Sequence, residues 1–72
     1  MSAAAQLETL LTEDDVAKRY GVTVRTVQKW RHSGVGPAYL KVGGGEKSPI
    51  RYRPSDLDAF DRKSLVSPKE QP

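Results

Sequence analysis

The 72-residue chain contains no cysteine. This absence excludes disulfides, thiolate metal ligands and a thiol nucleophile. Histidine occurs once, as His32, so the sequence offers no His-rich metal cluster and no choice of base for a nucleophilic triad. We therefore expect no catalytic residue, no metal site and no cofactor, and we expect that the protein is not an enzyme.

Long apolar stretches are also missing. No run approaches the roughly 20 residues that a helix needs to cross a bilayer, and the opening MSAAAQLETLL contains Glu8 but no basic residue, unlike a secretory signal. A chain of this length forms at most one domain, which buries only about 60% of the surface of its unfolded chain and leaves little room for an enclosed active site. We expect a soluble, cytoplasmic domain without membrane contact.

Acidic side chains are almost absent from the middle of the chain. Residues 17–53 contain nine Lys and Arg side chains against one carboxylate, Glu46, whereas residues 1–16 contain four carboxylates and no basic residue. The formal net charge of +3 thus hides a basic centre between acidic ends. A single positive face on a small domain is typical of nucleic-acid binding, so a nucleic acid is the expected partner.

Two short helices are predicted on either side of a glycine turn. Thr12 is a good N-cap for the first helix, whose first turn is acidic, and Gly21 ends it. Thr23 caps the second helix, which covers residues 24–33 and stops at Gly34. Two helices joined by a turn of about three residues that contains glycine are typical of a helix-turn-helix.

A β-hairpin and a third helix follow. Residues 38–42 and 50–53 have strand propensity, and the GGGEKSP stretch between them forms a long, mobile turn. The third helix begins at Pro54 and has an apolar side. Three aromatic side chains of this half of the sequence are expected in the core: Tyr39, Tyr52 and Phe60.

These elements define the expected fold class, which is mainly α with a small β-hairpin: a winged helix-turn-helix. The DNA-binding domain is expected over residues 10–64. Residues 1–9 form a flexible N-terminus, and residues 65–72 form a disordered polar tail.

The second predicted helix has two faces. At 100° per residue, Val27 and Trp30 lie on one side and form, with Val22, the inward stripe. The opposite face carries side chains that suit base edges, because Arg pairs with guanine and Gln with adenine. This face consists of Arg25, Gln28, Lys29 and His32. Arg31 lies near the edge of the packed side, where we expect it to contact phosphate or solvent.

A solvated helix face is the alternative interpretation of these charges. Three features favour DNA: the turn-helix spacing, the lack of acidic residues between Lys18 and Val42 as salt-bridge partners, and a hairpin with Arg51 and Arg53 on one face. Thr23, at the N-terminus of the second helix, is placed to contact a phosphate.

Four motifs together resemble the small winged-helix excisionase family, whose members are also called recombination directionality factors of phages. This family is related to MerR-type DNA-binding domains. They are LLTEDDVAKRYGV, GVTVRTVQKW, GPAYLKVG and IRYRPSDLDAF, and they span residues 10–62. The resemblance implies a recognition helix in the major groove and a wing against the backbone or minor groove. The wing departs from many members, because GGGEKSP replaces a short Arg-rich turn.

The resemblance also implies which residues contact DNA. The matching positions of the recognition helix are Thr23, Val24, Arg25, Thr26, Gln28 and Lys29. To these we add His32, because it lies on the outward face of the same predicted helix. The wing and backbone positions are Lys41, Lys47, Arg51 and Arg53, with which we group Arg19.

By resemblance, the function is that of an architectural factor. Several copies would bind adjacent sites, contact one another, bend attachment-site DNA and direct the phage integrase toward prophage excision. The implied partners are double-stranded DNA, the integrase and further copies of the chain, with no small-molecule effector. Two alternatives stay open: a small MerR-like transcriptional regulator of a phage or prophage, and a protein-binding adaptor that uses the third helix and the tail.

Overall fold

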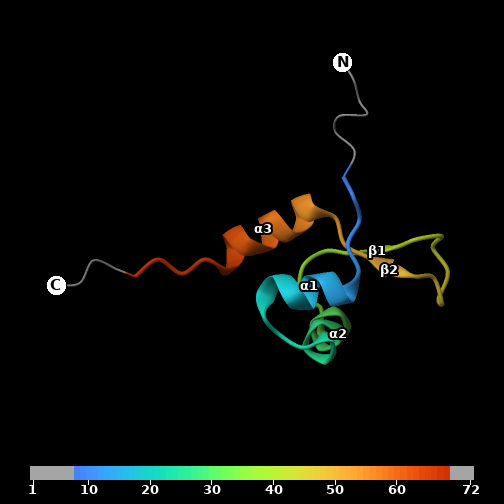
Figure 1. The fold of residues 1–72 in the computed structure, drawn as a ribbon, viewed down its shortest axis with the longest axis horizontal. Coiled ribbons are helices and arrows are strands. Elements are labelled where there is room, and N and C mark those ends of the chain that lie inside the picture. Colours follow the sequence, from blue (N-terminus) through green and yellow to red (C-terminus); the bar gives the residue numbers. More distant parts are fainter. Residues whose placement is uncertain (1–7, 69–72) are drawn as a thin grey trace, which may run out of the picture.

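The computed structural model describes residues 8–68 and contains three helices and one hairpin (Figure 1). The elements are α1 (Glu13–Tyr20), α2 (Val24–Ser33), β1 (Leu40–Lys41), β2 (Ile50–Arg51) and α3 (Pro54–Ser64). This is a small winged helix-turn-helix, so the predicted fold class is confirmed. Most of the predicted flexible N-terminus and the last part of the predicted tail lie outside the described residues. None of the described helices is long and apolar enough to cross a membrane.

Local capping chemistry sets the helix boundaries where the sequence predicts them. The Thr12 hydroxyl accepts from the backbone N–H of Asp15 at 3.1 Å, and the Asp15 carboxylate accepts from the backbone N–H of Thr12 at 3.0 Å. The hydrogen bond from the Thr12 backbone N–H, followed by the contribution of the Thr12 hydroxyl, holds the pKa of Asp15 below its usual value. Gly21 ends α1 in the left-handed region at φ 67°, and the Thr23 hydroxyl then caps α2 by accepting from the Thr26 N–H at 3.1 Å.

The strands are shorter than the sequence predicts. β1 and β2 pair antiparallel, with Leu40 opposite Arg51. Tyr52 leaves the hairpin ladder and pairs instead with Leu11, and each residue donates its N–H to the other's carbonyl at 2.8 Å. The segment before α1 therefore lies beside the hairpin and fixes its base against the helices (Figure 1).

A compact core holds the helices against the hairpin. Its buried members are Val16, Ala17, Val27, Tyr52 and Leu57. Beside it, the rings of Tyr20, Trp30 and Phe60 form an aromatic cluster that joins all three helices, with ring centroids 5.6–5.9 Å apart. Trp30 thus packs against the core, as predicted. The prediction for Tyr39 is wrong, because this residue is 37% exposed and lies outside the buried core, with its ring beside that of Tyr52.

Glu8, which precedes α1, is tied to the start of α3. Arg53, the N-cap residue of α3, makes no side-chain capping bond. The Glu8 carboxylate takes this role and accepts from the Ser55 N–H at 2.7 Å and from the Ser55 hydroxyl at 3.0 Å. An anionic group at a helix N-terminus is favoured by the helix dipole. Glu8, predicted to lie in a flexible segment, therefore helps to place α3.

Polar contacts hold α3 against α1. The Tyr20 hydroxyl donates to Asp61 at 2.6 Å, and the Arg19 guanidinium donates to Asp61 at 2.5 Å and to Asp58 at 3.1 Å. These hydrogen bonds, first from Tyr20 and then from Arg19, hold the pKa of Asp61 below its usual 3.8. Burial raises the pKa of Tyr20 to about 12, so its hydroxyl stays a donor across the physiological range.

We predict that Asp61 makes the fold sensitive to acid. The folded state lowers the pKa of the Asp61 carboxyl, so the unfolded chain takes up a proton there at a higher pH than the folded chain does. The stability that the Asp61 carboxylate contributes is therefore lost as the pH falls from about 3.8 toward the lower pKa of the folded state. Asp61→Asn should be less stable than the wild type at neutral pH but should lose less stability between about pH 4 and pH 2. Thermal melts at each pH, followed by circular dichroism, measure this loss of stability. For Tyr20→Phe we expect a loss between those of the wild type and Asp61→Asn. An unchanged acid profile for Asp61→Asn would contradict the prediction.

Candidate nucleic-acid interface

Ion pairs divide the basic side chains into two groups. Four of them pair with carboxylates: Lys18 with Asp14, Arg19 with Asp58 and Asp61, Arg31 with Glu13, and Arg53 with Asp56. Within residues 8–68, the other basic side chains of α2 and the hairpin make no ion pair: Arg25, Lys29, Lys41, Lys47 and Arg51. All four of these paired cations are bound to carboxylates of α1 or α3. The positive charge left uncompensated is therefore concentrated on α2 and the hairpin.

The exposed side of α2 carries three unbonded side chains. Arg25, Lys29 and His32 lie at i, i+4 and i+7, which places them along one side of the helix. All three are exposed, and none makes a side-chain hydrogen bond within the described part of the chain. This row can therefore offer a guanidinium, an ammonium and an imidazole to a ligand without breaking an internal bond.

The rest of the predicted reading face is engaged with the protein. Val24 packs against the core, and the hydroxyls of Thr23 and Thr26 lie 3.0 Å apart in a shared hydrogen bond at the start of α2. Gln28 is half-buried, and its Nε2 donates to Glu13 Oε1 at 3.3 Å. The helical periodicity of the sequence placed Gln28 opposite the packed stripe of α2. In the structure, however, the first turn of α1 lies against the side of α2 that carries Gln28. The freely exposed face is thus narrower than the sequence predicts.

The residues predicted to contact DNA from the wing and along the backbone differ in exposure and in hydrogen bonding. Lys41 and Lys47 are exposed on the hairpin, and Arg51 is half-buried and donates to its own neighbour's carbonyl, that of Ile50, at 2.8 Å. Arg53 donates to Asp56 at 2.6 Å and 3.2 Å, which keeps it at the start of α3. Arg19 is held by carboxylates of α3. Of this predicted set, Lys41 and Lys47 are the most accessible to a ligand.

The tip of the hairpin is an ordered turn. Gly43 and Gly44 adopt φ values of 103° and 77°, a region that glycine occupies without strain. The Ser48 hydroxyl accepts from the Gly45 N–H at 2.8 Å, and the Gly44 N–H donates to the Lys41 carbonyl at 2.9 Å. The loop that the sequence predicts to be mobile thus has a defined hydrogen-bonded path.

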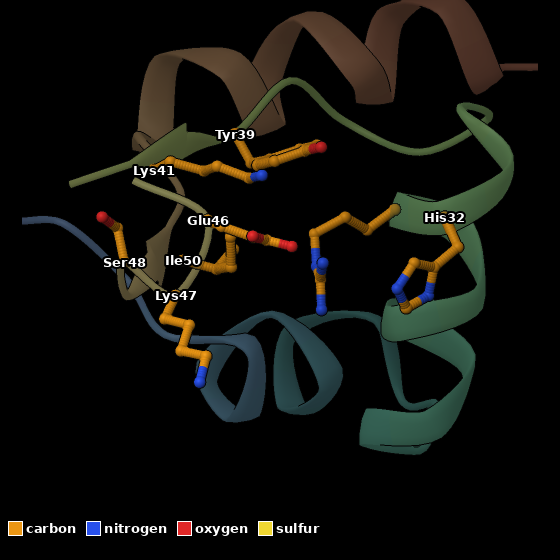
Figure 2. Close-up of a pocket in the computed structure, with 8 residues that line it drawn as sticks. His32, Tyr39, Lys41, Glu46, Lys47, Ser48 and Ile50 are labelled. Carbon is orange, nitrogen blue, oxygen red and sulfur yellow. The ribbon is translucent and has the colours of Figure 1, made fainter. Parts of the chain in front are cut away.

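A hollow of about 460 Å³ separates the end of α2 from the hairpin (Figure 2). Its lining includes Arg31 and His32 from α2, Tyr39 and Lys41 from the chain leading into the hairpin, and Glu46 and Lys47 from the hairpin loop. Most of its ionisable side chains are basic, so the hollow favours an anionic ligand.

Sequence reasoning missed the link between Glu13 and Arg31. Arg31 Nε donates to Glu13 Oε2 at 2.7 Å, and each side chain is only 17% exposed. A usable signal was present: no acidic residue lies between Lys18 and Val42, so a carboxylate partner for Arg31 had to come from another element. The acidic first turn of the preceding helix, which a helix-turn-helix brings beside the second helix, was the nearest source.

Fold and charge together define a class of protein: a small winged helix-turn-helix with a basic recognition side, suited to sequence-specific binding of double-stranded DNA. The model of a helix-turn-helix domain family matches residues 10–63. The chain therefore belongs to this family of DNA-binding domains, which includes excisionase-like proteins. No curated protein and no solved structure matches the chain significantly.

Proposed function

We propose that the protein is an excisionase that binds and bends attachment-site DNA and directs a phage integrase toward prophage excision. The observation that carries the DNA-binding part is the concentration of unpaired positive charge on α2 and the hairpin. The excisionase part is supported by membership of a family that includes excisionase-like proteins and by the resemblance of residues 10–62.

In this proposal, α2 lies in the major groove. The exposed row of Arg25, Lys29 and His32 faces base edges, and the N-terminus of α2, with Thr23 and Thr26, lies at the backbone. Gln28 can still accept a hydrogen bond through its amide oxygen while its nitrogen donates to Glu13. Val24, which packs on the core, supports the helix start beside these polar groups.

The hairpin makes the second contact with the same DNA. Lys41, Lys47 and Arg51 supply positive charge along the backbone beside the groove that α2 occupies. Arg19 and Arg53 lie in ion pairs with α3 carboxylates, and we assign them to the fold rather than to DNA. Smoothly bending a site of 20–30 base pairs costs roughly 1–6 kcal/mol. We propose that contacts from several copies on adjacent sites offset this cost.

A recombination assay tests this function. Purified integrase is incubated with attachment-site DNA for excision and, separately, for integration, with and without the protein. We expect the protein to raise the excision product and lower the integration product. An Arg25→Ala/Lys29→Ala variant should lose this effect while keeping its fold, and an Arg62→Ala/Lys63→Ala variant on α3 serves as the matched control. An unchanged balance with the wild-type protein would reject the excisionase role.

The same samples separate the alternatives. Salt-sensitive binding to promoter DNA, together with an unchanged recombination balance, would favour a transcriptional regulator on the same fold. Failure to bind any duplex in a gel shift would favour a protein-binding adaptor. Binding that does not weaken with salt would favour it too, because a domain that contacts several phosphates loses affinity steeply as salt rises.

A further inference from the structure

Arg31 makes a single ion pair within residues 8–68. Its Nε donates to Glu13 Oε2 at 2.7 Å, and its guanidinium also lies near the Tyr52 hydroxyl, but its Nη atoms contact no second carboxylate in this part of the chain. A guanidinium has five N–H donors, so four lie on the Nη side. For a side chain that is only 17% exposed, this is a large donor capacity beyond the ion pair. Arg31 is thus firmly positioned, and its ion pair does not use the Nη donors.

The Arg31 guanidinium also lies against an aromatic ring. Arg31 Cζ lies 5.9 Å from the centroid of the Tyr39 ring, which adds a cation–π contact to the hydrogen bond that Arg31 donates to Glu13. Arg31 also lines the hollow between α2 and the hairpin. The same hollow is lined by Lys41 and Lys47, whose side chains come from the opposite wall (Figure 2).

We propose that this hollow binds one phosphate of the DNA backbone, which accepts hydrogen bonds from the Nη groups of Arg31. This proposal rests on the DNA-binding function above and names one contact of that interface. The planar guanidinium matches the geometry of phosphate oxygens and binds them in a bidentate manner. Lys41 and Lys47 add charge from the hairpin, so a bound phosphate joins the recognition helix to the wing. Glu13 acts as a positioning residue, because it orients Arg31 without using its Nη donors.

Glu46 opposes the phosphate in the same hollow. Its carboxylate lies among the cations of the lining and makes no ion pair with the other described residues (Figure 2). A carboxylate and a phosphate repel each other, so Glu46 has to turn toward solvent when DNA binds. Removing its charge by Glu46→Gln should therefore strengthen binding to all duplexes alike.

The salt dependence of DNA binding tests the proposal. Because phosphate contacts do not depend on sequence, a mixed-sequence 30-base-pair duplex is a sufficient probe, and fluorescence anisotropy gives its affinity in about 50–200 mM salt. Each phosphate contact contributes about −0.9 to the slope of log affinity against log salt. Arg31→Gln should make the slope shallower by about 0.9 and weaken binding. Arg62→Gln, which removes an exposed arginine at the end of α3, should leave the slope unchanged.

Glu13→Gln separates a phosphate contact from a merely structural ion pair. Both Glu13→Gln and Arg31→Gln remove the ion pair, but Glu13→Gln keeps an oxygen that can accept from Arg31 Nε and leaves the guanidinium in place. If Arg31 served only Glu13, both variants would lose stability and keep the wild-type slope. We expect them to diverge, with the shallower slope for Arg31→Gln alone.

Thermal melts ensure that each variant is compared while folded. If Arg31→Gln melts too low, Arg31→Lys replaces it, and we expect a wild-type slope with weaker affinity, because lysine lacks the bidentate fork. A folded Arg31 variant that matches the wild type in slope and affinity, with no gain from Glu46→Gln, would overturn the phosphate site and leave DNA binding intact. Wild-type protein without any salt-dependent duplex binding would instead reject the proposed function.

Discussion

Replacing Leu57 by alanine is expected to leave a large part of the protein unfolded at 25 °C. Leu57 is fully buried at 0% exposure, on the side of α3 that packs against the core. A buried Leu→Ala replacement costs about 2–5 kcal/mol, because the lost methyl and methylene groups leave a cavity. A single core in a domain this small rarely supplies more than about 3–5 kcal/mol in total. The replacement thus removes most or all of the stability.

Urea denaturation followed by circular dichroism measures this effect, and Leu65→Ala is the matched control. Leu65 follows α3 at 73% exposure, so its truncation should change the free energy of unfolding by less than about 0.5 kcal/mol. If Leu57→Ala unfolds at nearly the same urea concentration as the wild type, α3 does not belong to the cooperative core. In that case α1 would hold the recognition helix α2 in place without α3.

The helix boundaries were predictable because the chemistry that sets them is local. The N-caps Thr12 and Thr23 bond to groups three residues ahead, and Gly21 and Gly34 end their helices in a left-handed conformation. All of these signals fall within a few residues of the boundary that they mark. The inward stripe of α2 was predictable for the same reason, since the period of the helix places Val27 on the packed side.

The pairing of charges was not predictable in the same way. Glu8 and Ser55 are 47 residues apart, and Arg19 and Asp61 are 42 residues apart, so no sequence window contains both partners. The second of these pairs engages Arg19, one of the cations that the sequence assigned to DNA. A helix wheel ranks residues by the face of their own helix and therefore could not show that Glu13 engages Gln28. The sequence was enough to assign the candidate site to α2 and the hairpin. It was not enough to show which basic side chains of that site are free of ion pairs within residues 8–68.

Replacing Arg25 by alanine should remove sequence preference at a single base pair. Arg25 is the second residue of α2, is exposed, and its side chain makes no hydrogen bond within the described chain. The N-terminal part of a recognition helix reaches base edges in the major groove, and arginine there binds guanine O6 and N7 together. The lost contact should reduce discrimination at that position by about 1–3 kcal/mol and leave the other positions unchanged. Selection from a random duplex library, sequenced for wild type and variant, measures the preference at every position.

Lys47→Ala is the control variant for Arg25→Ala, because it is expected to lower affinity without changing sequence preference. Lys47 is exposed on the hairpin loop, where it can neutralise a phosphate but has no paired donors that match a base edge. Its loss should weaken binding to every duplex by a similar factor and make the salt slope shallower by about 0.9, with the selected sequence unchanged. If both variants instead alter the selected sequence, the hairpin also reads bases. If neither does, specificity comes from DNA shape, and α2 serves to position the protein on the backbone.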